Sequence, residues 1–118
     1  MRRLAMAVTL AVLAGCADVS FVDRITVAND TDFPATVDVT DAARSGWLRL
    51  GLAQDVSETS FGNVIDQGDV WVFRFDYAGK FQQELEVTRA DLERNDWTIM
   101  IPPEFETALR EMGLDPPP

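Results

Sequence analysis

The chain has 118 residues, a formal net charge of −10 at neutral pH, one cysteine and no histidine. This length suits one domain, and the acidic balance argues against nucleic acid, whose phosphates attract Lys and Arg. The missing histidine removes the commonest general base, the Ser–His and Cys–His triads and the usual zinc ligands, and the single cysteine excludes an intrachain disulfide, so an apolar core has to hold the fold.

The first 15 residues have the pattern of an export signal. Met1-Arg2-Arg3 gives a positive start, and the mostly apolar stretch from Leu4 to Leu13 follows it. A basic start, a short apolar stretch and small residues at the end are typical of a secretory signal. A membrane-spanning helix needs about 20 apolar residues, so we predict a cleaved signal peptide over residues 1–15.

Leu13-Ala14-Gly15-Cys16 ends this segment and resembles the lipobox of bacterial lipoproteins at all four positions. The resemblance implies cleavage between Gly15 and Cys16 and attachment of a diacylglyceryl group, with fatty acids such as palmitate, to the Cys16 thiol. The alternative is an ordinary signal followed by a chance cysteine. Two acyl chains suffice for stable anchoring without a span. We therefore expect the mature protein in the cell envelope, on the outer face of the cytoplasmic membrane or on an outer membrane.

The mature chain divides into a tether, a domain and a tail. Loss of Arg2 and Arg3 with the signal leaves 103 residues with a net charge of −12. We predict a lipidated tether over residues 16–20, one domain over 21–115 and a proline tail over 116–118. At about 3.5 Å per residue, the tether holds the domain within roughly 15–30 Å of the bilayer. The negative charge argues against adhesion to anionic lipid surfaces.

Seven short segments of the mature chain alternate apolar and polar residues, which predicts β-strands. They lie at Ile25–Ala28, Ala35–Thr40, Trp47–Leu52, Glu58–Ile65, Val70–Tyr77, Phe81–Val87 and Trp97–Ile101. Turn residues separate them. The predicted fold is mainly β: a sandwich that resembles the antiparallel immunoglobulin-like architecture but lacks the cysteine pair of antibody domains.

Two helices are predicted beside the strands. Thr88 precedes Asp91 by three positions, which resembles a capping box, and Leu92 can then face the core. Pro102-Pro103-Glu104 suits the start of a C-terminal helix. That helix carries an apolar stripe of Phe105, Ala108, Leu109 and Met112. Gly113 is a natural C-terminal cap that lets Leu114 fold back onto the stripe.

Aromatic residues suggest one core row and one binding candidate. Side chains alternate along a strand, so Trp71, Phe73, Phe75 and Tyr77 share one face. Such a row can bind sugars or proline-rich peptides, but we expect it to fill the space between two sheets. Trp47 falls opposite the row Leu48, Leu50 and Leu52. It is therefore the candidate for an exposed ligand contact, the alternative being a residue that covers the sheet edge.

Carboxylates offer weaker candidates for metal binding or hydrolysis. Asp30 and Asp32, with Asn29, Asp38 and Asp41 nearby, carry the oxygen ligands that calcium prefers. Their spacing matches no complete calcium loop, and turn carboxylates usually bond their own backbone, so we assign no metal and no cofactor. Paired carboxylates can also hydrolyse glycosides, but nothing singles out a pair among Asp66, Asp69 and Asp76.

The sequence thus favours a lipid-anchored envelope lipoprotein that acts without catalysis. The expected role is binding of an envelope protein, or structural support, with no nucleic acid partner. A small ligand-binding or calcium-binding module is the alternative, with Trp47 and the Asp30–Asp32 turn as its first residues to test. An envelope hydrolase is a weaker third reading.

Overall fold

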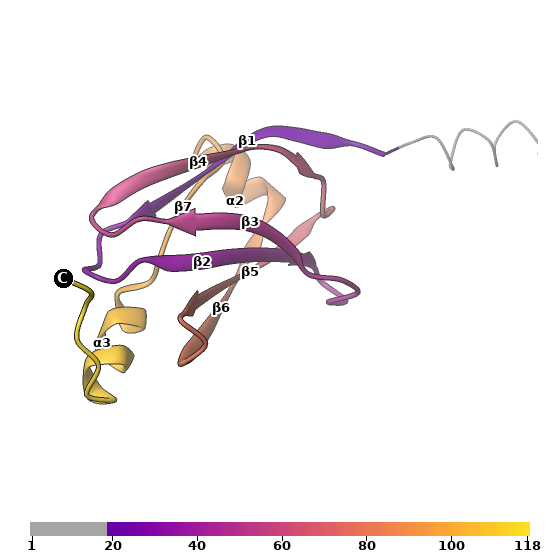
Figure 1. Cartoon of the computed structure of the whole chain (residues 1–118). Coiled ribbons are helices and arrows are strands. Elements are labelled where there is room, and N and C mark those ends of the chain that lie inside the picture. Colours follow the sequence, from indigo (N-terminus) through magenta and orange to yellow (C-terminus); the bar gives the residue numbers. More distant parts are fainter. Residues whose placement is uncertain (1–18) are drawn as a thin grey trace, which may run out of the picture.

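The computed structural model describes residues 19–118 (Figure 1), so the signal peptide, the cleavage site and Cys16 lie outside the described residues. The described part of the chain contains seven strands and two helices. In chain order they are β1 (Phe21–Asn29), β2 (Ala35–Asp41), β3 (Leu48–Ala53), β4 (Ser57–Ile65), β5 (Val70–Tyr77), β6 (Phe81–Thr88), α2 (Arg89–Arg94), β7 (Thr98–Met100) and α3 (Pro103–Glu111).

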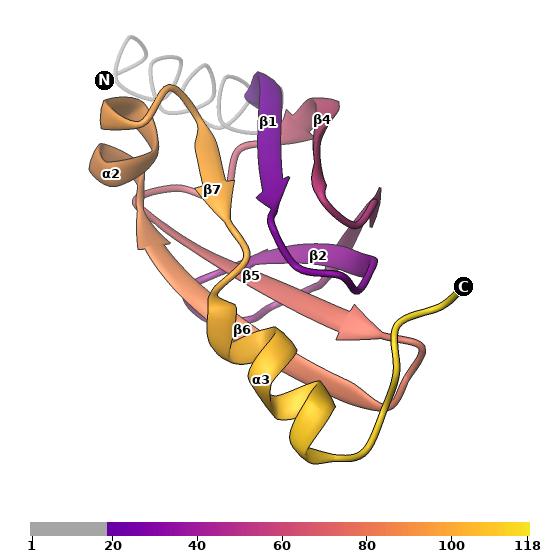
Figure 2. The same ribbon diagram turned by 90° about the vertical axis from the view of Figure 1, so that its left-hand side faces the viewer.

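The strands form two sheets that face each other. One sheet has the order β4-β1-β7 and the other the order β3-β2-β5-β6. Figure 2 shows the first sheet on one side and β2, β5 and β6 on the other. This arrangement confirms the predicted mainly β sandwich with a short helix and a C-terminal helix.

The strand connections give this sandwich its own topology. In immunoglobulin constant domains the first two strands share a sheet, whereas here β1 and β2 lie in different sheets. All neighbouring strands pair antiparallel except β1 and β7, which run parallel. The likeness to immunoglobulin domains therefore concerns the layered architecture.

The core lies between the two sheets and is rich in aromatic side chains. Trp71, Phe73 and Phe75 on β5 are fully buried, and Tyr77 packs half-buried at the end of the same row. This confirms that the aromatic row fills the space between the two sheets. The opposite sheet supplies smaller residues against it, including Val22, Ile25, Val27, Val64 and Ile99.

The predicted leucine row on β3 is wrong at its last member. The pairing of β2 with β3 shifts by one residue between Val37 and Asp38. Val37 pairs with Gly51, whereas Asp38 pairs with Arg49, and Leu50 has no partner on β2. Leu50 is the extra residue of this bulge. Leu48 and Leu50 pack on the core, but Leu52 is 47% exposed. One inserted residue reverses the side-chain alternation beyond it.

Both helices form where they were expected. The Thr88 hydroxyl accepts a hydrogen bond from the Asp91 N–H at 3.1 Å, and Leu92 is fully buried. On α3, Phe105 and Leu109 are buried and Leu114 folds back onto the core. These contacts confirm the Thr88 cap and the apolar stripe, except that Met112 is 52% exposed. The Asp91 carboxylate pairs with Arg94, so the second half of the capping box is not formed.

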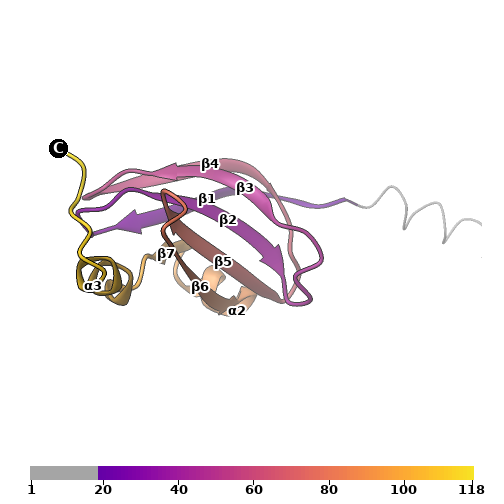
Figure 3. The same ribbon diagram turned by 60° about the horizontal axis from the view of Figure 1, so that its bottom comes forward.

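The C-terminal helix α3 lies at one end of the sandwich. Figure 1 and Figure 3 place α3 and the C-terminus at the end away from the start of β1. β1 begins at Phe21, four residues before the predicted start at Ile25. β7 begins at Thr98, one residue after the predicted start at Trp97. Trp97 is left outside the strand in a left-handed backbone conformation, with φ of 55°.

Candidate binding site

An open groove lies beside the first half of β1. It has a volume of about 660 Å³ and is lined by β1 and by the segment from α2 to β7. The lining residues are Phe21, Val22, Asp23, Arg24, Arg89, Asp96 and Trp97. Two parts of the chain more than 60 residues apart in sequence thus form its walls.

The groove follows a strand edge that has no partner strand within the described residues. β4 pairs with β1 from Phe21 to Asn29, but β7 pairs with β1 only from Thr26 to Ala28. The half of β1 before Thr26 therefore has a neighbouring strand on one side only. An unpaired strand edge presents backbone N–H and C=O groups that can receive another extended chain.

The wall opposite β1 is held in place by Trp97, Arg89 and Asp66. The Trp97 ring packs edge-to-face on the buried Trp71, with ring centroids 5.7 Å apart. The Arg89 guanidinium lies 5.3 Å from the Trp97 ring centre and donates to an Asp66 carboxylate oxygen at 2.6 Å. The hydrogen bond from Arg89 lowers the pKa of Asp66, and the same bond raises the pKa of Arg89. Trp97 and Arg89 on this wall are thus each held by a contact with a residue behind the groove.

Arg24 is the arginine of residues 19–118 that has no carboxylate partner. The other arginines of this part each form an ion pair, including Arg44 with Glu84 and Arg94 with Asp91. Arg24 is exposed and lines the groove. A guanidinium without a carboxylate partner on the groove wall can donate hydrogen bonds to a carboxylate or a backbone carbonyl of a ligand.

Trp47, the candidate predicted from the sequence, lies on the outer face of the four-stranded sheet and away from the groove. The Arg74 guanidinium stacks over its ring, 3.9 Å from the ring centre. Arg74 and Arg49 both donate to Asp38, whose side chain is only 4% exposed. The half-buried Trp47 therefore covers the Arg74 guanidinium, which is one of the two that bind the nearly buried Asp38 carboxylate.

The predicted calcium residues do not converge. Asp30 is exposed, and Asp32 binds Arg110 at 2.9 Å. The oxygen of the buried Asn29 side chain accepts from the N–H and the hydroxyl of Thr31. Within residues 19–118, no three acidic, histidine or cysteine side chains gather in a way that could hold a metal ion.

The remaining carboxylates named from the sequence serve local structure. Asp38 belongs to the cluster under Trp47, and Asp41 accepts hydrogen bonds from Ser45, which lower its pKa. Asp66 pairs with Arg89, and Asp76 accepts from the Gly79 N–H in the hairpin turn. Asp66 and Asp76 are thus each engaged by a hydrogen bond from another part of the fold.

The groove is not predictable from the sequence pattern. The pattern places Trp97 at the start of a strand, and nothing in it connects Trp97 or Arg89 with residues 21–24. The contrast between the full-length pairing of β1 with β4 and its three-residue pairing with β7 is a property of the folded sheet. No sequence pattern reports it.

Comparison with known proteins adds no relative. No family model, no curated protein and no solved structure matches this chain. Neither helix in the part of the chain that the structure describes is long and apolar enough to cross a membrane.

Proposed function

We propose that this chain is a lipid-anchored envelope lipoprotein that binds an extended segment of another envelope protein in the groove beside β1. The observation that carries the proposal is the free edge of β1 next to that groove. Adding a strand to such an edge gives affinity through backbone hydrogen bonds, and side-chain pockets give selectivity.

The groove offers the contacts that an extended segment requires. Trp97 provides apolar surface, while Arg24 and Arg89 provide donors and Asp23 and Asp96 provide acceptors. Because both charge signs are present, the ligand chemistry is that of a mixed polar and apolar peptide. The chain's lack of histidine and its single cysteine favour binding over catalysis.

The anchor is supported by the sequence around Cys16 and by the start of the domain. Cys16 precedes β1 by five residues. Replacing Cys16 with Ser should prevent incorporation of an alkyne-labelled palmitate and leave the protein as unprocessed precursor or released. A normally processed, lipid-bearing Cys16→Ser product would contradict the anchor.

Site-specific crosslinking in intact cells tests the groove. A photoreactive amino acid at Asp23, on the groove, should give a discrete product with one envelope protein. The same probe at Lys80, in the hairpin turn between β5 and β6, should not. Equal products from both positions, or none from Asp23, would contradict the proposed site.

A charge reversal supplies a second test on the recovered partner segment. Arg24→Glu should weaken binding of that segment several-fold, because the free guanidinium is lost from the groove wall. Lys80→Glu makes the same change in net charge away from the groove and should leave binding unchanged. Equal loss in both variants would mean that overall charge, and not the groove, governs the interaction.

A further inference from the structure

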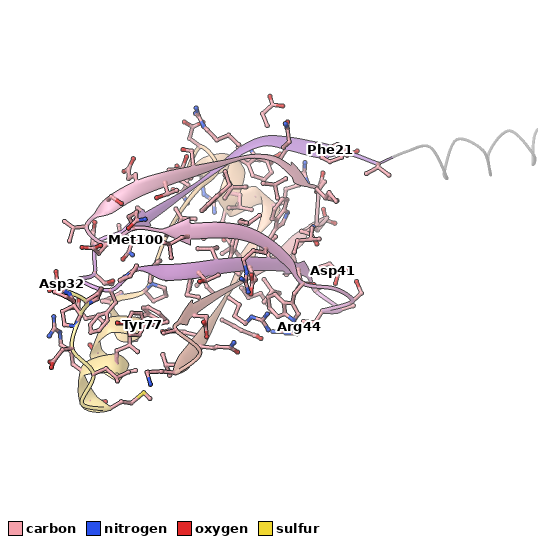
Figure 4. The ribbon with its side chains drawn as sticks, viewed as in Figure 1. Phe21, Asp32, Asp41, Arg44, Tyr77 and Met100 are labelled. Atoms are coloured by element: carbon pink, nitrogen blue, oxygen red, sulfur yellow. The ribbon has the colours of Figure 1, made fainter. Side chains whose placement is uncertain are left out.

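Three exposed apolar side chains gather at the end of the domain where β1 begins. Val19 is 60% exposed, Phe21 is 56% exposed and Ile65 is 39% exposed. Phe21 on β1 pairs across the strands with Ile65 on β4, and Val19 and Ile65 line one shallow hollow together with Ser20, Asp66 and Gly68. We call Val19, Phe21 and Ile65 the apolar tip. Figure 4 shows Phe21 at the end of the molecule opposite Asp32 and Met100.

The outward direction of these side chains is fixed by their neighbours. Val22 and Val64, the next pair along β1 and β4, are buried in the core. Successive side chains on a strand point to opposite faces, so Phe21 and Ile65 must face away from the core. The tip is thus a consequence of sheet register, and the fold leaves it uncovered within the described residues.

The chain places this tip beside its own anchor. Val19 lies three residues after Cys16 and Phe21 five residues after it. Five residues span at most about 18 Å, so a lipid chain on Cys16 keeps Phe21 within that distance of the membrane surface. Apolar and aromatic side chains at this distance gain by entering the boundary between lipid headgroups and acyl chains.

One carboxylate beside the tip is neutralised by an ion pair. The carboxylate of Asp66, beside the hollow, is paired with Arg89. The acidic net charge of the chain opposes binding to anionic lipid, so the contact is an apolar one that suits a neutral lipid surface.

We infer that the apolar tip rests in the bilayer interface and orients the domain, with β1 rising from the membrane and the groove opening next to the lipid surface. This inference rests on the proposed lipid anchor and deepens the proposed function. The partner segment bound in the groove then lies beside the membrane. A segment that directly follows a membrane-spanning helix of the partner would meet this requirement.

Depth-dependent quenching of a site-specific fluorophore tests the inference. The lipidated full-length protein is placed in phosphatidylcholine vesicles that contain a lipid with a quencher near its headgroup. The acylated Cys16 leaves no other thiol, so a single environment-sensitive probe can be attached to Val19→Cys or Ile65→Cys at the tip. The control is Met100→Cys, which is 55% exposed at the other end of the domain.

Tip probes should be quenched several-fold more strongly than the Met100 probe, and their emission should shift to the blue. Equal quenching at all positions would overturn the tip contact. Tip probes that are shielded from the lipid quencher and also from aqueous iodide would show a protein occupant and overturn it as well. Flotation with the vesicles reports the anchor separately: a protein that does not float contradicts the anchor and the tip together, whereas one that floats with unquenched tip probes contradicts the tip alone.

Discussion

Asn29 holds the turn between β1 and β2 from inside the domain. Its side chain is fully buried; the amide nitrogen donates to the carbonyls of Phe33 and Ala53, and the oxygen accepts from the N–H and hydroxyl of Thr31. A buried polar group is tolerated when its hydrogen bonds are made. The turn that the sequence offered as a calcium candidate is therefore built around an amide.

Replacing Asn29 with Ala should lower the free energy of unfolding by about 1–3 kcal/mol, since it leaves buried backbone and hydroxyl groups without partners. Denaturant unfolding followed by tryptophan fluorescence would measure the loss. The exposed neighbour Asp30 provides the control, and Asp30→Ala should change stability by less than about 0.5 kcal/mol. Equal effects at the two positions would contradict the role given to Asn29.

At the scale of the strand, Gly51 explains the irregular course of β3. Its φ of 149° and its missing side chain admit the Phe61 ring of β4, since a Cβ at Gly51 would lie 2.7 Å from a ring carbon. β3 and β4 are edge strands of the two different sheets, so this contact joins the sheets at their edges.

Gly51→Ala should destabilise the domain by about 1–3 kcal/mol, as expected for overpacking. Gly46→Ala is the matched control, because a Cβ at Gly46 meets no atom within 4 Å. Thermal unfolding of both variants would separate them. A Gly51→Ala protein as stable as Gly46→Ala would show that the Phe61 ring moves aside freely.

At the scale of the helix, the Asp66–Arg89 pair ties the start of α2 to the turn before β5. Because Arg89 lowers the pKa of Asp66 in the folded state, the fold favours the ionised carboxylate. Its contribution to stability is complete above the unfolded pKa of about 3.9 and is lost as the pH falls through the lower folded value.

Asp66→Asn should therefore be less stable than the original protein at neutral pH, with a difference that shrinks as the pH falls below about 4. Urea unfolding across this pH range measures the difference. A gap that stays constant down to the acid end would mean that the ionised pair contributes nothing.

At the scale of the whole molecule, stability depends on one small core without a disulfide. α3 closes one end of this core, with the Phe105 ring centroid 6.4 Å from that of Phe75 and 5.8 Å from that of Phe81. Domains of this kind have a total stability of about 5–15 kcal/mol, so a single large buried ring is a substantial part of it.

Phe105→Ala should cost about 3–5 kcal/mol and lower the midpoint of thermal unfolding in one cooperative transition that includes the sheets. The exposed Met112, which caps the C-terminus of α3, is the control, and Met112→Ala should have little effect. If Phe105→Ala released α3 while the sandwich melted unchanged, the helix would be an appendage and not part of the core.

The sequence by itself determined the local features of this protein. Strict alternation located β5 and its inward aromatic row, and the spacing of Thr88 and Asp91 located the start of α2, because these patterns depend on residues within a few positions of each other. The short apolar stretch before Cys16 predicts the anchor in the same way.

Only the tertiary structure decided the strand order, the reversal at Leu52 and the position of the groove. Sheet order depends on which strands meet after the chain has crossed between layers, and the bulge at Leu50 accompanies a contact between Gly51 and a ring ten residues away. The groove exists because β7 covers only Thr26–Ala28 of β1. Contacts between distant segments decide each of these features. The alternation of apolar and polar residues along the chain carries no information about such contacts.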